Sequence, residues 1–104
     1  MTVVSVYAVF ANSEEAETIG RSVVEARLAA CVNILGAIHS IYWWRGAVES
    51  AQEVACVFKT TADRADALIA RIAALHSYDV PCIAIWPIDK ILATCSAWVE
   101  DSVG

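Results

Sequence analysis

The sequence has little charge and no cluster of positive charge. Only 18% of its 104 residues are charged, and twelve acidic residues outnumber seven basic ones, for a formal net charge of −5. No run of lysine or arginine occurs along the chain. Because a protein attracts a phosphate backbone through clustered positive charge, this composition argues against nucleic acid as a partner.

The chain also lacks paired cysteines. Its four cysteines are far apart and form no C-x-x-C pair: they are Cys31, Cys56, Cys82 and Cys95. This spacing argues against a zinc finger, a thioredoxin-type redox motif and a secreted disulfide scaffold. We expect most of the four side chains to be buried as small hydrophobic groups.

A membrane span and a leader are missing from the pattern as well. Asn33 interrupts the first apolar run, Pro81 and Pro87 bracket the last, and no run reaches the roughly 18 to 20 residues of a spanning helix. The first residues alternate like a strand and the first basic residue is Arg21, so we expect no cleavable leader. The sequence therefore predicts a cytoplasmic protein without a membrane partner.

What the chain has in excess is apolar surface. Its residues are 59% hydrophobic and its mean hydropathy is +0.57. A small domain has a high surface-to-volume ratio and should need more polar cover than this. We therefore expect one domain, residues 1–104, whose surface is partly covered by further copies of the chain.

A long β-hairpin is the most informative segment. Residues 31–44 are rich in Val, Ile, Tyr and Trp, contain no proline, and would extend about 46 Å at roughly 3.3 Å per residue. A compact domain of this size is only about 34 Å across, so the hairpin must bend sharply or project, turning near Gly46. Four large apolar residues lie near its tip: Ile41, Tyr42, Trp43 and Trp44. Such a cluster favours self-association.

The periodicity of apolar residues predicts the order β-α-β-β-α-β followed by a short helix. The expected strands are 3–11, 31–44, 48–60 and 82–86, and the expected helices are 13–29, 62–75 and 92–99. This is the order of a ferredoxin-like sandwich in the α+β class, with both long helices on one face of an antiparallel sheet. In the last helix, Leu92, Cys95 and Val99 should face inward. Gly36 is a candidate β-bulge, which leaves open the side-chain alternation beyond Ala37.

Several segments together resemble the CutA divalent-cation tolerance proteins. They are ARLAACVNI at 26–34, SIYWWRG at 40–46, EV at 53–54, KT at 59–60, LHSYDVPCI at 75–83, Pro87-Ile88 and Ala97-Trp98. The resemblance implies a trimer of ferredoxin-like subunits, related in architecture to PII signalling proteins, with hairpins that pair across subunits. It also implies copper or divalent-cation binding and tolerance, with no accepted enzymatic activity.

Three residues are candidate metal ligands. His76 belongs to the family's copper-binding constellation, but Phe10 and Leu75 stand where that constellation has a thiol and a second histidine. Cys82, in place of the usual glutamate, and Cys31 could supply thiols, because thiolate and imidazole suit cuprous copper. The alternatives are a packed, inert Cys82 and a His76 that is hydrogen-bonded to a backbone carbonyl in a capping turn.

Five residues are candidates for a ligand-binding cleft. By resemblance, Trp44, Glu53 and Lys59 line the wall of a cleft between subunits, and Tyr78 and Asp79 follow His76 in one turn. A charge pair beside an aromatic ring can hold a small polar ligand, or it can be an interface salt bridge. The remaining histidine and two tryptophans have structural interpretations: His39 as a structural or exposed residue, Trp43 and Trp86 as packing anchors.

We therefore expect a trimeric cation-binding protein, copper being the first candidate. A small-molecule sensor or a scaffold with no physiological metal is the alternative. An enzyme using His76 as general base and Lys59 to hold an anionic substrate is less favoured. The sequence shows no nucleophile or carboxylate dyad with a recognisable activating partner.

Overall fold

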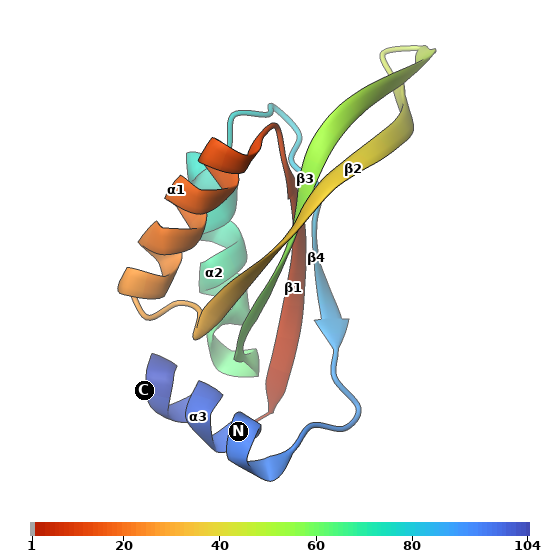
Figure 1. Ribbon diagram of the computed structural model, residues 1–104. Coiled ribbons are helices and arrows are strands. Elements are labelled where there is room, and N and C mark those ends of the chain that lie inside the picture. The colour runs from red at the N-terminus through yellow and green to blue at the C-terminus, as the bar shows by residue number, and fades with distance from the viewer. Residues whose placement is uncertain (1) are drawn as a thin grey trace.

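Four strands form one antiparallel sheet in the order β2-β3-β1-β4 in the computed structural model, which describes residues 2–104. The elements are β1 (Val3–Phe10), α1 (Ser13–Glu25), β2 (Cys31–Trp44), β3 (Ala47–Thr61), α2 (Ala62–Leu75), β4 (Ile83–Pro87) and α3 (Ala93–Val103). Both long helices cover the same face of the sheet, and α3 lies across its end near the two termini (Figure 1). The predicted ferredoxin-like α+β fold is therefore confirmed.

The core lies between the helices and alternate residues of the two central strands. Val6, Ala8 and Phe10 of β1 are fully buried beside Cys56 and Phe58 of β3. Each long helix contributes an apolar stripe to the core: Ala16, Ile19 and Val23 from α1, Leu68 and Ile72 from α2. Period-two burial on the strands and a helical stripe facing them were both readable from the sequence.

Helix α1 ends earlier than predicted. It begins after Asn12, whose side chain accepts a 2.8 Å hydrogen bond from the Glu15 N–H, as expected for an N-cap. The predicted end at Ala29 was wrong, because Arg27 adopts a φ of 58° and reverses the chain. The Arg27 guanidinium then donates a 2.9 Å hydrogen bond to the Ser102 carbonyl in α3.

Helix α3 is longer than predicted, and one of the three residues expected to face inward does not. It runs to Val103, and Leu92, expected to face inward, is 73% exposed just before the helix. Val99 faces inward as predicted, and with Val103 it packs on Val3 and Ala30 in a small second cluster.

The β2–β3 hairpin projects beyond the rest of the chain (Figure 1). The molecule measures 44 × 26 × 22 Å, which is longer than the compact domain expected for this chain length. Its tip is a two-residue turn in which Arg45 (φ 50°) and Gly46 (φ 84°) both have positive φ, the requirement of a type I′ turn. The predicted bulge is confirmed by a register shift between Ile34 and Gly36.

Most of the cysteines are less buried than predicted. Cys56 is buried, Cys31 and Cys95 are half-buried, and Cys82 is exposed, because β4 starts one residue after it. All four thiols are free. The alternative that Cys82 is packed inside a strand was therefore wrong.

The two tryptophans interpreted as packing anchors differ in how much they contact the rest of the chain. Trp86 stacks on Tyr7 of the neighbouring strand, with ring centroids 4.5 Å apart. Trp43, near the hairpin tip, is 74% exposed. Among residues 2–104, no helix is both long and apolar enough to cross a bilayer.

Candidate functional site

A groove of about 660 Å³ lies where the hairpin leaves the sheet. Strands β2 and β3 and the turn after α2 line it with aromatic and acidic side chains: Tyr42, Trp43, Trp44, Glu49, Glu53, Tyr78 and Asp79. Ser40, Ser77, Val9, Val80 and Cys82 complete the lining. The volume falls within the usual range of small-molecule sites, about 300–1,000 Å³.

Strand register explains why the hairpin residues meet here. Tyr42 and Trp44 are two residues apart on β2 and therefore point to one face. Tyr42 pairs directly with Glu49, and Glu53 lies four residues further along β3, on the same face. The groove is thus built on the face of the hairpin that carries Tyr42, Trp44, Glu49 and Glu53.

Tyr78 ties the turn after α2 to the hairpin. Its hydroxyl donates a 2.7 Å hydrogen bond to Glu53 Oε2. Burial, and then the negative charge and hydrogen bond of Glu53, raise the pKa of Tyr78 well above its usual value near 10. The phenol therefore stays protonated and keeps donating to the Glu53 carboxylate.

His76 lies behind the groove and positions the turn. Its Nε2–H donates a 2.7 Å hydrogen bond to the Val9 carbonyl, and its Nδ1 accepts one of 3.1 Å from the Tyr78 N–H. The ring stacks on Phe10 at 5.0 Å, and the side chain has no exposed surface. Both nitrogens are therefore engaged, which agrees with the interpretation as a histidine bonded to a backbone carbonyl.

One carboxylate oxygen beside His76 has no hydrogen-bond donor. Glu15 Oε1 is buried without a hydrogen-bond partner, 3.6 Å from His76 Nδ1. That nitrogen accepts a hydrogen bond from the Tyr78 N–H and has no proton to donate to the carboxylate.

The guanidinium group of Arg45 lies at the mouth of the groove. The Arg45 guanidinium carbon lies 5.1 Å from the centre of the Trp44 ring, and Nη2 is 3.8 Å from Asp79 Oδ2. Both charged side chains are mostly exposed. An exposed pair of this kind adds little to stability, but it shows which groups face each other.

Four of the five predicted cleft residues come together and the fifth does not. Trp44, Glu53, Tyr78 and Asp79 all line the groove. Lys59 instead donates a 3.1 Å hydrogen bond to Asn33 Oδ1 elsewhere on the sheet.

The predicted metal ligands are spread out within one chain. Cys82 lines the groove and His76 lies behind it. Cys31 pairs with Lys59, which also pairs with Ser5, whereas Val9 pairs with Ala55. Cys31 is thus displaced from the His76 end of β1 by four residues, about 13 Å along the strand. Across residues 2–104, no three His, Cys, Asp or Glu side chains gather as a metal site.

Sequence reasoning did not assign Glu49 or Tyr42 to the site. Alternation with Glu53 could have indicated Glu49, and pairing with Glu49 would then have indicated Tyr42. That pairing follows from the two-residue turn at Arg45 and Gly46, which sets the register of the hairpin from Trp44 and Ala47 back to Ala37 and Val54.

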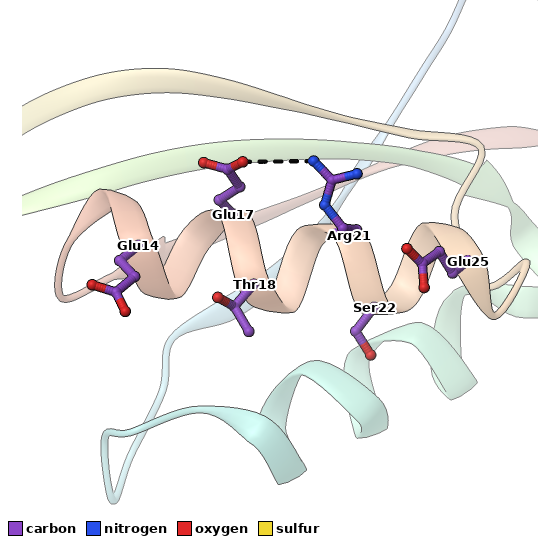
Figure 2. Close-up of a pocket in the computed structure, with 6 residues that line it drawn as sticks. All are labelled: Glu14, Glu17, Thr18, Arg21, Ser22 and Glu25. Atoms are coloured by element: carbon purple, nitrogen blue, oxygen red, sulfur yellow. Dashed lines mark ion pairs between the residues drawn. The ribbon is translucent and has the colours of Figure 1, made fainter.

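A second hollow, of about 380 Å³, lies on the outer surface of α1. Figure 2 shows its six lining residues, all from that one helix: Glu14, Glu17, Thr18, Arg21, Ser22 and Glu25. Glu17 and Arg21 form an exposed ion pair at 3.6 Å. These are features of a solvated helix face with an ordinary i,i+4 pair.

Comparison with known proteins gives a consistent result. The model of the family described as CutA1 divalent ion tolerance protein matches residues 4–102. A divalent-cation tolerance protein CutA from Archaeoglobus fulgidus is 38% identical over 94% of this chain and 95% of its own. One from Thermus thermophilus is 41% identical over 89% of this chain and 90% of its own.

A solved structure agrees with these sequence matches. It is described as the periplasmic divalent cation tolerance protein CutA from Archaeoglobus fulgidus. It superposes with a TM-score of 0.95 at 36% identity, covering 98% of this chain and 99% of the other.

Proposed function

The chain belongs to the CutA1 divalent ion tolerance protein family, and on that basis we propose that it binds a divalent cation or a small polar ligand in the hairpin groove. The observation that carries this proposal is that Glu49, Glu53, Asp79 and Cys82 all line one groove. Carboxylates suit hard divalent cations, and a thiolate suits copper.

Copper is the proposed ion because Cys82 is the thiol that faces the groove. The thiol set is incomplete within one chain, so a second copy must supply further ligands. Direct ligand roles for His76 and Cys31 stay predictions: His76 would have to release one of its two backbone partners, and Cys31 would have to act across subunits.

The proposed assembly is a homotrimer. Strand β2 is 14 residues long and lies at the edge of the sheet, so one side of it carries backbone groups without a neighbouring strand. Long exposed edges invite pairing with another chain. Large apolar side chains lie exposed along the hairpin and β4: Ile41, Trp43, Val48, Ile85 and Trp86. Copies of the chain would cover both features.

The protein is proposed to be cytoplasmic. Four free thiols, one of them exposed, suit a reducing compartment. One similar structure is described as periplasmic, so fractionation of cells that express the chain under its own promoter is the relevant test.

Metal titration tests the central proposal. Adding copper to metal-free, untagged protein should raise the melting temperature by several degrees, since a ligand at 100 times its Kd adds about 2.7 kcal/mol. Cys82→Ser should remove most of the rise, and Cys95→Ser, at a half-buried thiol on α3, should keep it. A wild-type protein that copper leaves unchanged would contradict the proposal for this ion, and calcium, magnesium and zinc would be titrated next.

A sensor or scaffold with no physiological metal is the second candidate. The observation in its favour is that no three-residue metal cluster forms within residues 2–104. It would be supported if every metal left the melting temperature unchanged. We propose no catalytic role: the relatives are named as tolerance proteins, and His76, the candidate base, has both nitrogens engaged.

A further inference from the structure

We propose that the hairpin groove binds a small organic cation, one that carries a guanidinium or alkylammonium group. This deepens the proposed function by naming a ligand class for the same groove, and it rests on that groove being open in the assembled protein. It does not require that a metal bind.

The aromatic lining favours an organic cation over a bare metal ion. Three aromatic rings share one side of the groove: Tyr42 and Trp44, on the same face of β2, and Tyr78, which is hydrogen-bonded to Glu53. The face of such a ring attracts a cation that is weakly hydrated and has apolar surface of its own. A small hydrated metal ion gains little from aromatic faces, and it takes its ligands from oxygen, nitrogen and sulfur.

The charge of the groove has the matching sign. Glu49, Glu53 and Asp79 line it, and no lysine or arginine belongs to the lining of the described chain. Glu53 accepts the Tyr78 hydroxyl on Oε2, so the hydrogen bond holds its carboxylate in place while leaving capacity to accept from a second donor. Tyr78 contributes a ring to the lining and its hydroxyl donates to that carboxylate.

The chain itself shows what the mouth of the groove can hold. The Arg45 guanidinium lies over the Trp44 ring at 5.1 Å and reaches Asp79 at 3.8 Å. An aromatic face and a carboxylate thus already contact a guanidinium there. Because Arg45 is tethered to the turn and exposed, a free cation that also reaches Glu53 can displace it.

A pair of matched probes tests the inference. Butylguanidinium would be titrated into the assembled, metal-free protein by calorimetry in the presence of a chelator, and then its uncharged analogue butylurea. Both have the same planar shape and the same alkyl chain, and butylurea lacks the positive charge because a carbonyl oxygen replaces one nitrogen. Butylurea should bind about tenfold more weakly or worse, as expected when about 1.4 kcal/mol of charge-dependent affinity is lost. Equal binding of the two probes would overturn the inference, and so would no heat from butylguanidinium.

Variants locate the binding. Glu53→Gln and Trp44→Leu should each weaken butylguanidinium binding severalfold. Glu25→Gln, on the outer surface of α1, is the matched control and should leave it unchanged. If Glu25→Gln weakened butylguanidinium binding equally, the effect would come from the overall charge, and binding in the groove would be contradicted.

Arg45→Asn is an independent test, because this variant should bind butylguanidinium more tightly instead of more weakly. Asparagine is favoured in a type I′ turn, so the hairpin should keep its fold. Removing the internal guanidinium should tighten butylguanidinium binding ~2–5-fold, the equivalent of one exposed cation–π contact. Weaker binding of butylguanidinium in this variant would mean that Arg45 does not compete with the cation, and would overturn the inference.

The outcomes separate this inference from the proposed function. If copper raises the melting temperature and butylguanidinium does not bind, the inference fails and the metal proposal stands. If butylguanidinium binds and no metal has an effect, the metal proposal fails and the inference stands.

Discussion

The imidazole of His76 has a structural role in this chain. Its imidazole joins the Val9 carbonyl of β1 to the Tyr78 N–H of the turn and stacks on Phe10. These contacts set the path of the turn that carries Tyr78 and Asp79 into the groove. At the residue scale, the groove therefore depends on a histidine that does not line it.

Replacing His76 should destabilise the protein strongly. His76→Ala leaves a buried carbonyl and an N–H without partners and opens a cavity beside Phe10, so the free energy of unfolding should fall by about 2–4 kcal/mol. Urea unfolding followed by tryptophan fluorescence measures it. His39→Ala, at an exposed position of β2, is the control and should change it by about 0.5 kcal/mol or less. A similar small change for His76→Ala would contradict the anchoring role.

Tyr78 should make stability depend on pH in alkali. Its pKa is raised in the folded protein and lies near 10 when unfolded, so its contribution is complete below pH 10 and is lost as pH rises further. The free energy of unfolding of the wild type should therefore fall more steeply above pH 10 than that of Tyr78→Phe. Urea titrations from pH 9 to 11.5 compare the slopes, with Tyr42→Phe as control. Parallel slopes would show that the phenol is not protected.

Burial also raises the pKa of the Cys56 thiol from its ordinary value of 9.0 to about 11. The unfolded chain releases this proton at lower pH than the folded chain, so Cys56 adds a loss of stability between pH 9 and 11. The Tyr78→Phe comparison should therefore be made in a Cys56→Ala background as well. That background separates the two groups.

At the scale of secondary-structure elements, the contact of α1 with β2 depends on a glycine. A Cβ built on Gly20 would lie 2.9 Å from Cγ1 of Val32, closer than such atoms approach. Gly20 therefore lets the helix lie close to the edge strand from which the hairpin extends.

Gly20→Ala tests that contact. In a solvent-exposed helix this change would stabilise by up to about 1 kcal/mol, but here the clash should reverse the sign and cost about 1–3 kcal/mol. Thermal unfolding of Gly20→Ala, Val32→Ala and the double variant completes a cycle. In the Val32→Ala background the alanine should be tolerated better. An additive double variant would contradict the close contact.

The hairpin shows how much of an element can be predicted. Its length, its turn at Gly46 and its bulge before Gly36 were all expected from composition and glycine placement. The end of α1 was not, because Arg27 takes a positive φ that a sequence normally reserves for glycine or asparagine. Backbone hydrogen bonds from Arg27 N–H to the Val24 carbonyl and from Leu28 N–H to the Val23 carbonyl close the helix around this residue, as in a Schellman C-cap.

At the scale of the whole molecule, a single chain exposes more apolar surface than a small domain normally does. Trp43 is 74% exposed, Ile41 71% and Val48 58%, all on the projecting hairpin. A hairpin that projects cannot cover its own tip, so the proposed trimer is the arrangement that would bury it.

Charge at the hairpin tip should therefore disrupt assembly. Sedimentation equilibrium of the wild type at micromolar concentration should give the mass of three chains. Trp43→Asp should lower it, because a carboxylate buried at an apolar interface is costly. Ala67→Asp, on the exposed face of α2, is the control and should leave the mass unchanged. A folded wild-type monomer in dilute solution would contradict the trimer and any site shared between subunits.

The sequence alone determined the order of the elements, the faces of the central strands and the unusual length of the hairpin. These depend on local periodicity and on glycine and proline placement, which neighbouring residues encode. Only the tertiary structure decided which polar residues meet: Glu53 with Tyr78 at the groove, His76 with Val9 behind it, and Lys59 with Asn33 away from it. The reason is physical: such contacts depend on how strands pair and on the path of the turn after α2, which bring together residues far apart in the sequence.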